Sequence, residues 1–412
     1  MKKRIVIFAV AMGCLLATRL VVMYATPLFE PSEARYAAIS ANMARTGDFL
    51  VPSFTYKGTY RPFAGKPPLV FQASGVFCRI LGVSEFAVRL APFLSFAVLL
   101  ALLFVVVRRL ADIEAGLLAV GICATSVAFY AAAGFCMTDT CLALCSSGAL
   151  LLYLLHRTAS EKPSLRIVIG ISTLLGLGML VKGPVALALF GLPVVADAAI
   201  NRKWKYILSI RWLLGVVIFV AISAPWFCMM ENAQPGFIRY FFINENLLRF
   251  LVHDYGDMYG SGRETFRGMA LVWALVVTMP WSLFTLFRQR CMGLHALRTS
   301  FPLLASAVIT VFWCLTSRVP IAYLLPVVPL FSAHLALYGA RDGSCRSITW
   351  RVFPFAAAIS AIALVATLMV VLVFAPEKMP GTAAEQTLRK SRFSYEFYNG
   401  PWGQGAPTEF VK

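Results

Sequence analysis

About eleven long apolar stretches run through this chain, and they constrain its fold more than any other feature. A membrane-spanning helix needs about 20 mostly apolar residues, because the hydrocarbon core is about 30 Å thick and a helix rises about 1.5 Å per residue. Inside lipid every backbone polar group must be paired, so such stretches fold as helices. The predicted spans are Ile5–Tyr24, Leu90–Val107, Gly116–Ala132, Leu142–Leu155, Ile167–Leu180, Val185–Ile200, Trp212–Phe227, Met269–Phe287, Phe301–Leu315, Ile321–Leu337 and Phe353–Phe374.

The composition agrees with an all-α polytopic membrane protein. Hydrophobic residues make up 59% of the 412 residues, and the mean hydropathy is +0.77. Soluble domains contain about 45–50% apolar residues. In a soluble protein a net charge of +18 suggests nucleic-acid binding, but no Lys/Arg-rich domain with interleaved aromatic residues is present. We therefore exclude nucleic acid as a partner and expect a lipid bilayer.

The first apolar stretch follows three basic residues and has the general look of a signal peptide. The apolar run continues past Arg19, however, and no small-residue cleavage site stands out. We therefore expect a retained first helix. Residues 1–374 are predicted to form one membrane domain with a first outer loop at 25–89. Residues 375–412 are expected to form a short extracytoplasmic tail, because 38 residues are too few for a separate domain.

The loop charges predict the orientation of the chain. With the N-terminus in the cytoplasm, the short cytoplasmic segments contain 18 Lys and Arg residues and only five of the 19 acids. Short basic loops mark the cytoplasmic side of a membrane. The remaining acids, and most residues suited to chemistry, then face outward.

The first outer loop contains the densest group of charges in a chain that is only 14% charged. Ala34–Ala44 has apolar residues at roughly helical spacing, which predicts an amphipathic helix on the membrane surface. Gly and Pro interrupt Asp48–Pro68, which is expected to be a loop. A polar loop between spans is a typical place for a functional site.

Further charges lie on four other predicted outer segments. Asp139 lies at the mouth of a helix, Lys182 lies in a short turn, and Arg318 precedes another span. Met229–Gly268 contains the stretch YFFINENLLRF and is predicted to hold a second amphipathic helix. Charges at a membrane edge are costly unless partnered, so these residues are functional candidates.

The order of these elements resembles the GT-C polyprenyl-phosphate-dependent glycosyltransferases, among them the lipid A 4-amino-4-deoxy-L-arabinose transferases and the protein O-mannosyltransferases. The resemblance runs from about Thr26 to Leu337. Each motif alone is weak evidence for the family, but eight motifs in the family's order are strong evidence. They are EPSEARYA (Glu30–Ala37), GDFLVP (Gly47–Pro52), FAGKPP (Phe63–Pro68), MTDT (Met137–Thr140), VKGPVAL (Val181–Leu187), ENLLRF (Glu245–Phe250), MPWSLF (Met279–Phe284) and SRVPIAYLLP (Ser317–Pro326).

The resemblance implies a GT-C bundle that takes a sugar from a polyprenyl-phosphate carrier and passes it to an envelope glycolipid, glycan or protein. It implies the inner membrane of a bacterium, with the site facing the periplasm. It also implies an acidic residue acting as general base or activating the acceptor, for which Glu33, Asp139 and Glu30 are the candidates. Basic residues neutralise the carrier phosphate as it leaves, and the family's motifs match Lys66 and Arg249. The other predicted substrate-binding residues are Arg35, Tyr36, Lys182, Glu245, Arg318 and Tyr323.

The chain departs from the family pattern at two positions. The family usually has Asp before the Glu of the first-loop motif, where this chain has Ser32, and a hydroxyl cannot replace a carboxylate as a base. The family commonly has Glu before the Lys of the KPP element, where this chain has Gly65. A divalent cation that used this Glu would lose a ligand, so no metal site is predicted.

Each candidate also has a structural interpretation. Glu33 is a possible ion-pair partner of Arg35, Arg61 or Lys66. Asp139 suits a helix N-cap, and Lys182 could extend to the lipid headgroups. Arg249 suits contact with any lipid phosphate. Arg19, inside the first span, is expected to pair with a charge on a neighbouring helix. Arg318 and Tyr323 have packing as an alternative role.

A second functional hypothesis is a non-catalytic protein on the same scaffold, which binds or moves polyprenyl-phosphate lipids. Ser32 favours it. The joint presence of Glu33, Asp139, Lys66 and Arg249 favours the enzyme, since a binding protein does not need all four.

Overall fold

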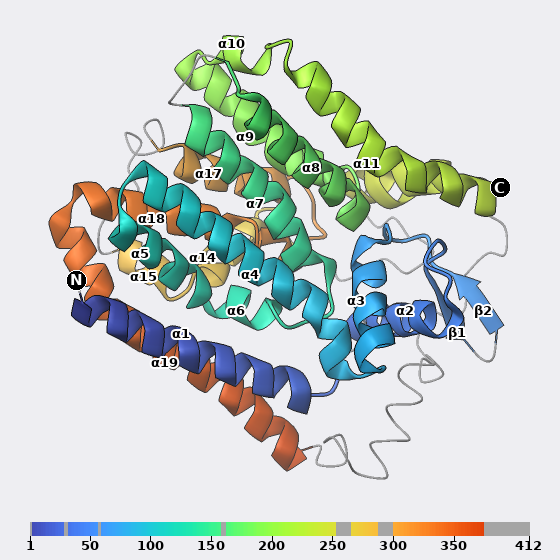
Figure 1. Cartoon of the computed structure of the whole chain (residues 1–412), viewed down its shortest axis with the longest axis horizontal. Coiled ribbons are helices and arrows are strands. Elements are labelled where there is room, and N and C mark those ends of the chain that lie inside the picture. The colour runs from blue at the N-terminus through green and yellow to red at the C-terminus, as the bar shows by residue number, and fades with distance from the viewer. Residues whose placement is uncertain are drawn as a thin grey trace.

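The computed structural model describes residues 2–28, 32–56, 59–157, 162–252, 265–286 and 300–374. Within these ranges the chain is a helical bundle with one β-hairpin (Figure 1). Residue 30 and the tail 375–412 lie outside the described residues. The elements up to α9 are α1 (Lys2–Ala25), α2 (Ser32–Thr46), β1 (Ser53–Tyr56), β2 (Thr59–Pro62), α3 (Leu69–Leu81), α4 (Glu85–Leu110), α5 (Ile113–Ala124), α6 (Val127–Ala132), α7 (Thr138–Arg157), α8 (Leu165–Lys182) and α9 (Val185–Asn201).

The second half of the chain is also helical. Its elements are α10 (Trp204–Ile207), α11 (Trp212–Ala233), α12 (Phe237–Arg239), the π-helix η1 (Tyr240–Leu248), α13 (Arg249–Leu251), α14 (Met269–Val277), α15 (Trp281–Leu286), α17 (Phe301–Cys314), the 3₁₀-helix η3 (Ile321–Leu324), α18 (Val327–Arg341) and α19 (Gly343–Phe374).

Seven helices in the described residues are long and apolar enough to cross a membrane. Several other predicted spans form shorter helices, among them α9 and α17. The stretch predicted at Gly116–Ala132 is divided into α5 and α6, and the stretch at Met269–Phe287 begins as α14 followed by α15. The polytopic helical fold is confirmed, whereas the number of eleven spans stays a prediction.

The two divided spans meet at their breaks and complete each other's hydrogen bonds. The backbone N–H of Val127 donates to the carbonyl of Met279 over 3.1 Å. The indole of Trp281 donates to the hydroxyl of Thr125 over 2.9 Å, and that hydroxyl donates to the carbonyl of Gly121. Interrupted helices persist inside a membrane protein where neighbouring groups pair the freed backbone in this way.

Charged residues gather at the two opposite ends of the bundle. At one end, Arg346 lies 2.7 Å from Asp112 and 3.6 Å from Glu114, which also pairs with Arg4 at 2.8 Å. These contacts join three of the segments that the sequence assigns to the cytoplasm. The other end carries α2, α3 and the β-hairpin, as Figure 1 shows.

The predicted helix of the first outer loop is present as α2. It is buried from Glu33 to Met43, because α3 and the hairpin cover it, so it does not lie with one face against a bilayer. Gly75 allows the close approach of α3, since a Cβ there would lie 3.0 Å from the carbonyl oxygen of Ser40.

The segment expected to be a loop instead contains the β-hairpin β1–β2. Its register pairs Ser53 with Pro62 and Tyr56 with Thr59. The carboxylate of Asp48 precedes it and accepts the N–H groups of Leu50 and Val51. Short hairpin strands give a weak sequence signal, and Gly and Pro concealed it here.

Candidate active site

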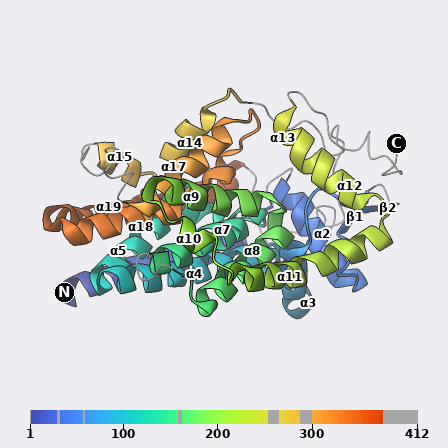
Figure 2. The same ribbon diagram turned by 90° about the horizontal axis from the view of Figure 1, so that it is seen from above.

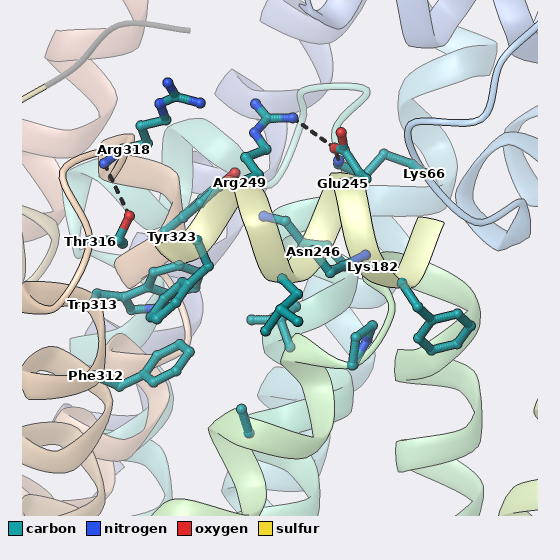
Figure 3. Close-up of a pocket in the computed structure, with 16 residues that line it drawn as sticks. Lys66, Lys182, Glu245, Asn246, Arg249, Phe312, Trp313, Thr316, Arg318 and Tyr323 are labelled. Carbon is teal, nitrogen blue, oxygen red and sulfur yellow. Dashed lines mark hydrogen bonds and ion pairs between the residues drawn. The ribbon is translucent and has the colours of Figure 1, made fainter. Parts of the chain in front are cut away.

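A pocket of about 380 Å³ lies at the hairpin end of the bundle (Figure 3). Its wall combines four basic side chains with aliphatic and aromatic ones, and the lining comes from segments far apart in the sequence. Figure 2 shows α12 and α13 on the same side of the molecule as β1 and β2. The lining includes six residues that the sequence predicts as site residues: Lys66, Lys182, Glu245, Arg249, Arg318 and Tyr323.

The centre of the pocket is one carboxylate shared by two cations. Glu245 forms an ion pair with Lys66, and its Oε1 also lies 2.7 Å from a guanidinium nitrogen of Arg249. The Lys66 ammonium also donates to the carbonyl of Gly65 over 2.6 Å. The structure therefore brings together three predicted residues from the FAGKPP and ENLLRF motifs.

The helix that carries Glu245 explains the arrangement. Residues 240–248 form the π-helix η1, and Arg249 follows directly on α13, so Glu245 and Arg249 are four residues apart on one face. Phe237 and Phe241 bury one side of this segment, while Ile243 and Leu247 are exposed on the other. The predicted amphipathic helix of the fourth outer loop is thus present.

Glu245 is almost fully buried, with 2% of its side chain exposed, whereas the side chains of Lys66 and Arg249 are 16% and 27% exposed. Its second oxygen, Oε2, is buried and has no hydrogen-bond partner among the described residues. A buried carboxylate oxygen without a donor is costly. The two cations, by contrast, retain access to the pocket.

A second ion pair borders the pocket. Lys182, at the end of α8, lies 2.5 Å from the Oδ1 of Asp139 and 3.8 Å from the centre of the Tyr323 ring. Both charged side chains are buried. Lys182 therefore points into the protein rather than out to the lipid headgroups. Asp139 lies in the first turn of α7, which begins at Thr138, and not at the position before the helix.

Glu33 has a different setting. It forms a buried ion pair with Arg89, whose Nε and Nη2 lie 2.8 and 3.1 Å from its two oxygens. The backbone N–H of Cys136 donates to the same carboxylate over 3.0 Å. Glu33 does not line the described pocket. Its proposed part in catalysis stays a prediction, as does that of Glu30, which lies outside the described residues.

Arg89 is the principal residue that the sequence interpretation missed. Besides the pair with Glu33, its guanidinium donates to the carbonyls of Met23, Thr26 and Pro27 and so joins α4 to the end of α1. The available signal was a base directly before the span predicted to start at Leu90, where a charge at the membrane edge needs a partner.

Arg35 and Tyr36 lie beside the pocket rather than in its wall. The guanidinium of Arg35 lies over the ring of Phe63 at 5.9 Å, and Tyr36 packs edge-on against Phe71 at 5.1 Å. Burial raises the pKa of Tyr36 above its ordinary value, and the nearby carboxylates of Asp139 and Glu245 raise it further.

The last lining segment carries Arg318 and Tyr323. The Tyr323 ring packs against Trp313 with centroids 4.6 Å apart, and the backbone N–H of Arg318 donates to the hydroxyl of Thr316. Figure 3 shows Arg318 and Arg249 on the same side of the pocket as Lys66. Trp313 and Phe312 are lining residues that the motifs did not indicate.

Among the described residues, no group of three or more His, Cys, Asp and Glu side chains is placed to hold a metal ion. His253, which lies on the predicted outer side, is outside the described residues. The expectation that the chain has no metal site stays a prediction.

Comparisons with known proteins agree with the motif interpretation. Residues 65–228 match the family of dolichyl-phosphate-mannose-protein mannosyltransferases. The chain is 30% identical over 244 residues to the undecaprenyl phosphate-alpha-4-amino-4-deoxy-L-arabinose arabinosyl transferase of Edwardsiella ictaluri, covering 57% of this chain and 43% of that protein. It is 27% identical over 361 residues to the protein of the same name from Erwinia tasmaniensis, covering 85% and 62%. The chain therefore spans less than half the length of the first relative.

The fold matches a solved structure closely. The crystal structure of ArnT from Cupriavidus metallidurans bound to undecaprenyl phosphate superposes with a TM-score of 0.69 at 22% identity, covering 94% of this chain and 74% of that one. The chain therefore has the GT-C fold, and the predicted resemblance is confirmed.

Proposed function

We propose that the chain is a membrane glycosyltransferase that moves a sugar from a polyprenyl-phosphate donor to an extracytoplasmic acceptor. The observation that carries the proposal is the convergence of Lys66 and Arg249 on one anionic position at the edge of a largely apolar pocket. A donor of this class has the matching chemistry, since it joins a phosphate to a long apolar chain. The relatives named above act on an undecaprenyl-phosphate sugar, which supports this class.

In this proposal the donor phosphate replaces the carboxylate of Glu245. Both Lys66 and Arg249 then face a phosphate oxygen, and Arg318 lies in the same wall. Charge-assisted hydrogen bonds from these groups stabilise the phosphate as it becomes the leaving group. The apolar side chains of Val185, Phe250 and Phe312 line the part of the pocket suited to the prenyl chain.

We assign the general base to Asp139 ahead of Glu33. Asp139 is paired to Lys182, which lines the pocket, whereas both oxygens of Glu33 are held by Arg89. A base at Asp139 takes the proton of the acceptor hydroxyl as the oxygen attacks the sugar carbon and the bond to the carrier phosphate breaks.

We propose the inner membrane of a bacterium as the location, with the N-terminus in the cytoplasm and the pocket facing outward. The basic short loops support this orientation. The acceptor class that fits is an envelope glycolipid or glycan, with lipid A suggested by the motif resemblance and a secreted protein as the alternative.

One alternative remains specific enough to test. A polyprenyl-phosphate-binding protein without transfer activity is favoured by Ser32 and by the full engagement of Glu33 with Arg89.

Mass spectrometry of envelope lipids and glycans tests the proposal. Cells that lack the gene are compared with cells rescued by wild type, by Lys66→Ala and by Arg79→Ala, an exposed cation on α3 that serves as a control. The proposal predicts that a pentose- or hexose-sized addition disappears on deletion and returns with wild type and Arg79→Ala only. If deletion changes no glycoconjugate under conditions in which wild-type cells express the gene, the lipid-binding alternative replaces the glycosyltransferase proposal.

A further inference from the structure

A second cavity of about 520 Å³ lies between α1, α4 and α5, with Tyr130 of α6 also in its wall, and it shares no lining residue with the candidate active site. Its wall is apolar except for two side chains, Arg19 and Tyr130. It opens sideways, because Gly13 and Leu16 on α1 and Ala97 and Ala101 on α4 are exposed. In a bilayer this opening faces lipid rather than water.

Arg19 is the only charged residue in this wall. It is 2% exposed, and its Nε has no hydrogen-bond partner among the described residues. Its guanidinium lies over the ring of Phe135 at 5.5 Å and presses on Gly134, where a Cβ would lie about 2.0 Å from a guanidinium nitrogen. The side chain is therefore confined to the end of the cavity next to Gly134 and Phe135.

Three other buried cations of the described chain form ion pairs with carboxylates. Arg89 pairs with Glu33, Arg157 with Asp197 and Lys182 with Asp139. No described carboxylate forms an ion pair with Arg19. A buried charge without a counter-ion is costly, so the cavity is suited to an anion supplied from outside the chain.

The length of the cavity indicates what carries the anion. Along α1 it extends from Arg19 to Phe8, which corresponds to about 16 Å at 1.5 Å per residue. Half of the hydrocarbon core, which is the reach of one acyl chain in one leaflet, is about 15 Å. Arg19 lies in the half of α1 nearer the candidate active site and Phe8 lies in the other half, so a tail that starts at Arg19, in the leaflet on the active-site side, runs to the bilayer centre and past it.

We propose that this cavity binds one anionic glycerophospholipid of that leaflet, with its phosphate at Arg19 and one acyl chain between α1 and α4. The lipid supplies the missing counter-ion and fills the apolar groove. It is a bound structural lipid and not the sugar donor, whose phosphate fits between Lys66 and Arg249.

Two variants separate the charge from the groove. Arg19→Gln removes the cation without leaving a described carboxylate unpaired, so the protein is expected to fold. Gly13→Leu fills the groove and leaves Arg19 in place, since a Cβ at Gly13 meets nothing within 4 Å. Gly191→Leu on α9 is the matched control, because it adds the same side chain into similarly open space outside the cavity. Lys66→Ala reports on the other pocket.

The experiment measures binding of phosphatidylglycerol and phosphatidylcholine to delipidated protein by native mass spectrometry and by the shift in melting temperature. Wild type, Gly191→Leu and Lys66→Ala are expected to bind one phosphatidylglycerol at least tenfold more tightly than phosphatidylcholine. Arg19→Gln should lose this preference, and Gly13→Leu should weaken binding of both lipids at least tenfold.

Equal affinity of wild type for the two lipids overturns the proposal, as does an unchanged preference in Arg19→Gln. Loss of the preference in Lys66→Ala places the lipid in the active-site pocket instead. A polyprenyl phosphate is also tested as a competitor of phosphatidylglycerol. If it displaces phosphatidylglycerol more strongly than other lipids do, and still does so in Lys66→Ala, the groove binds the carrier and the proposal is overturned. If Arg19→Gln does not fold, unchanged binding in Gly13→Leu decides against the proposal and weakened binding supports it.

Discussion

Lys66 and Glu245 are 179 residues apart in the sequence and form an ion pair at the centre of the pocket. Arg249 reaches the same carboxylate oxygen from the next helical turn. A carboxylate between two cations occupies the position that suits a phosphate. Glu245 therefore competes with a donor phosphate for the same two cations.

Lys66→Ala and Arg249→Ala should each weaken donor binding about tenfold to a hundredfold. A hydrogen bond to a charged group contributes about 1.5–3 kcal/mol, and about 1.4 kcal/mol corresponds to a factor of ten. The measurement is the KM for a lipid-linked sugar with purified protein, with Arg79→Ala as the control. An unchanged KM in both variants would place the phosphate elsewhere.

Glu245→Gln should strengthen donor binding, because the amide no longer competes for the two cations. A gain of about 1 kcal/mol corresponds to roughly fivefold tighter binding. Affinity for a non-transferable polyprenyl phosphate tests this, with Glu114→Gln at the opposite end of the bundle as the control. Weaker binding would show that Glu245 orients Lys66 and Arg249 for the phosphate rather than competing with it.

Asp139→Asn should lower kcat by about 10²–10⁴, the usual contribution of a general base, while the donor KM changes little. It also leaves the Lys182 ammonium buried without its carboxylate, which lowers stability by about 3–5 kcal/mol. The double variant Asp139→Asn/Lys182→Met removes that unpaired charge. It should recover melting temperature but not turnover. Recovery of turnover would assign the pair a structural role only.

Glu33→Gln and Arg89→Met should each destabilise the protein by about 3–5 kcal/mol, since each leaves a buried charge without its partner. The thermal melt of each single variant and of the double variant checks this, and the double loss should be smaller than the sum. Turnover per folded molecule then tests the catalytic prediction for Glu33. A fall in kcat at unchanged melting temperature would restore Glu33 as a base.

Tyr36 should make stability fall at alkaline pH. Its folded pKa is raised above the ordinary value of 10.0, so above about pH 10 the unfolded chain releases a proton that the folded chain keeps. The free energy of unfolding then decreases by about 1.4 kcal/mol per pH unit until the folded pKa is reached. Tyr36→Phe should remove this part of the slope between pH 10 and 11. Equal slopes in the two proteins would contradict the raised pKa.

Sequence reasoning recovered the helical membrane fold because apolar stretches of span length have few alternatives in lipid. It also found the pocket, since Lys66, Lys182, Glu245, Arg249, Arg318 and Tyr323 line it together. It did not find the partner of Glu33. Arg35, Arg61 and Lys66 were the candidates because they are close in sequence, whereas Arg89 is 56 residues away. Tertiary packing decides such a pairing, and no local pattern records it.

The hairpin and the burial of α2 were missed for a related reason. The spacing of apolar residues shows which face of a helix is apolar. It does not show whether other elements also cover the more polar face. Here α3 and β1 cover it. The divided spans at Thr125 and Met279 likewise depend on each other, and each alone has the composition of an unbroken span.

The pairing of α1 with α19 bears on how the bundle is made. These two helices lie side by side in Figure 1, although roughly 320 residues separate the end of one from the start of the other. At about 5–20 residues per second of synthesis, α1 waits about 15–60 seconds in the bilayer before α19 exists. During that time its partner face is open to other membrane proteins and to insertion factors. Assembly is therefore expected to finish only after the last described helix is made, and chains stopped after α18 should be recognised by quality-control proteases as unfinished.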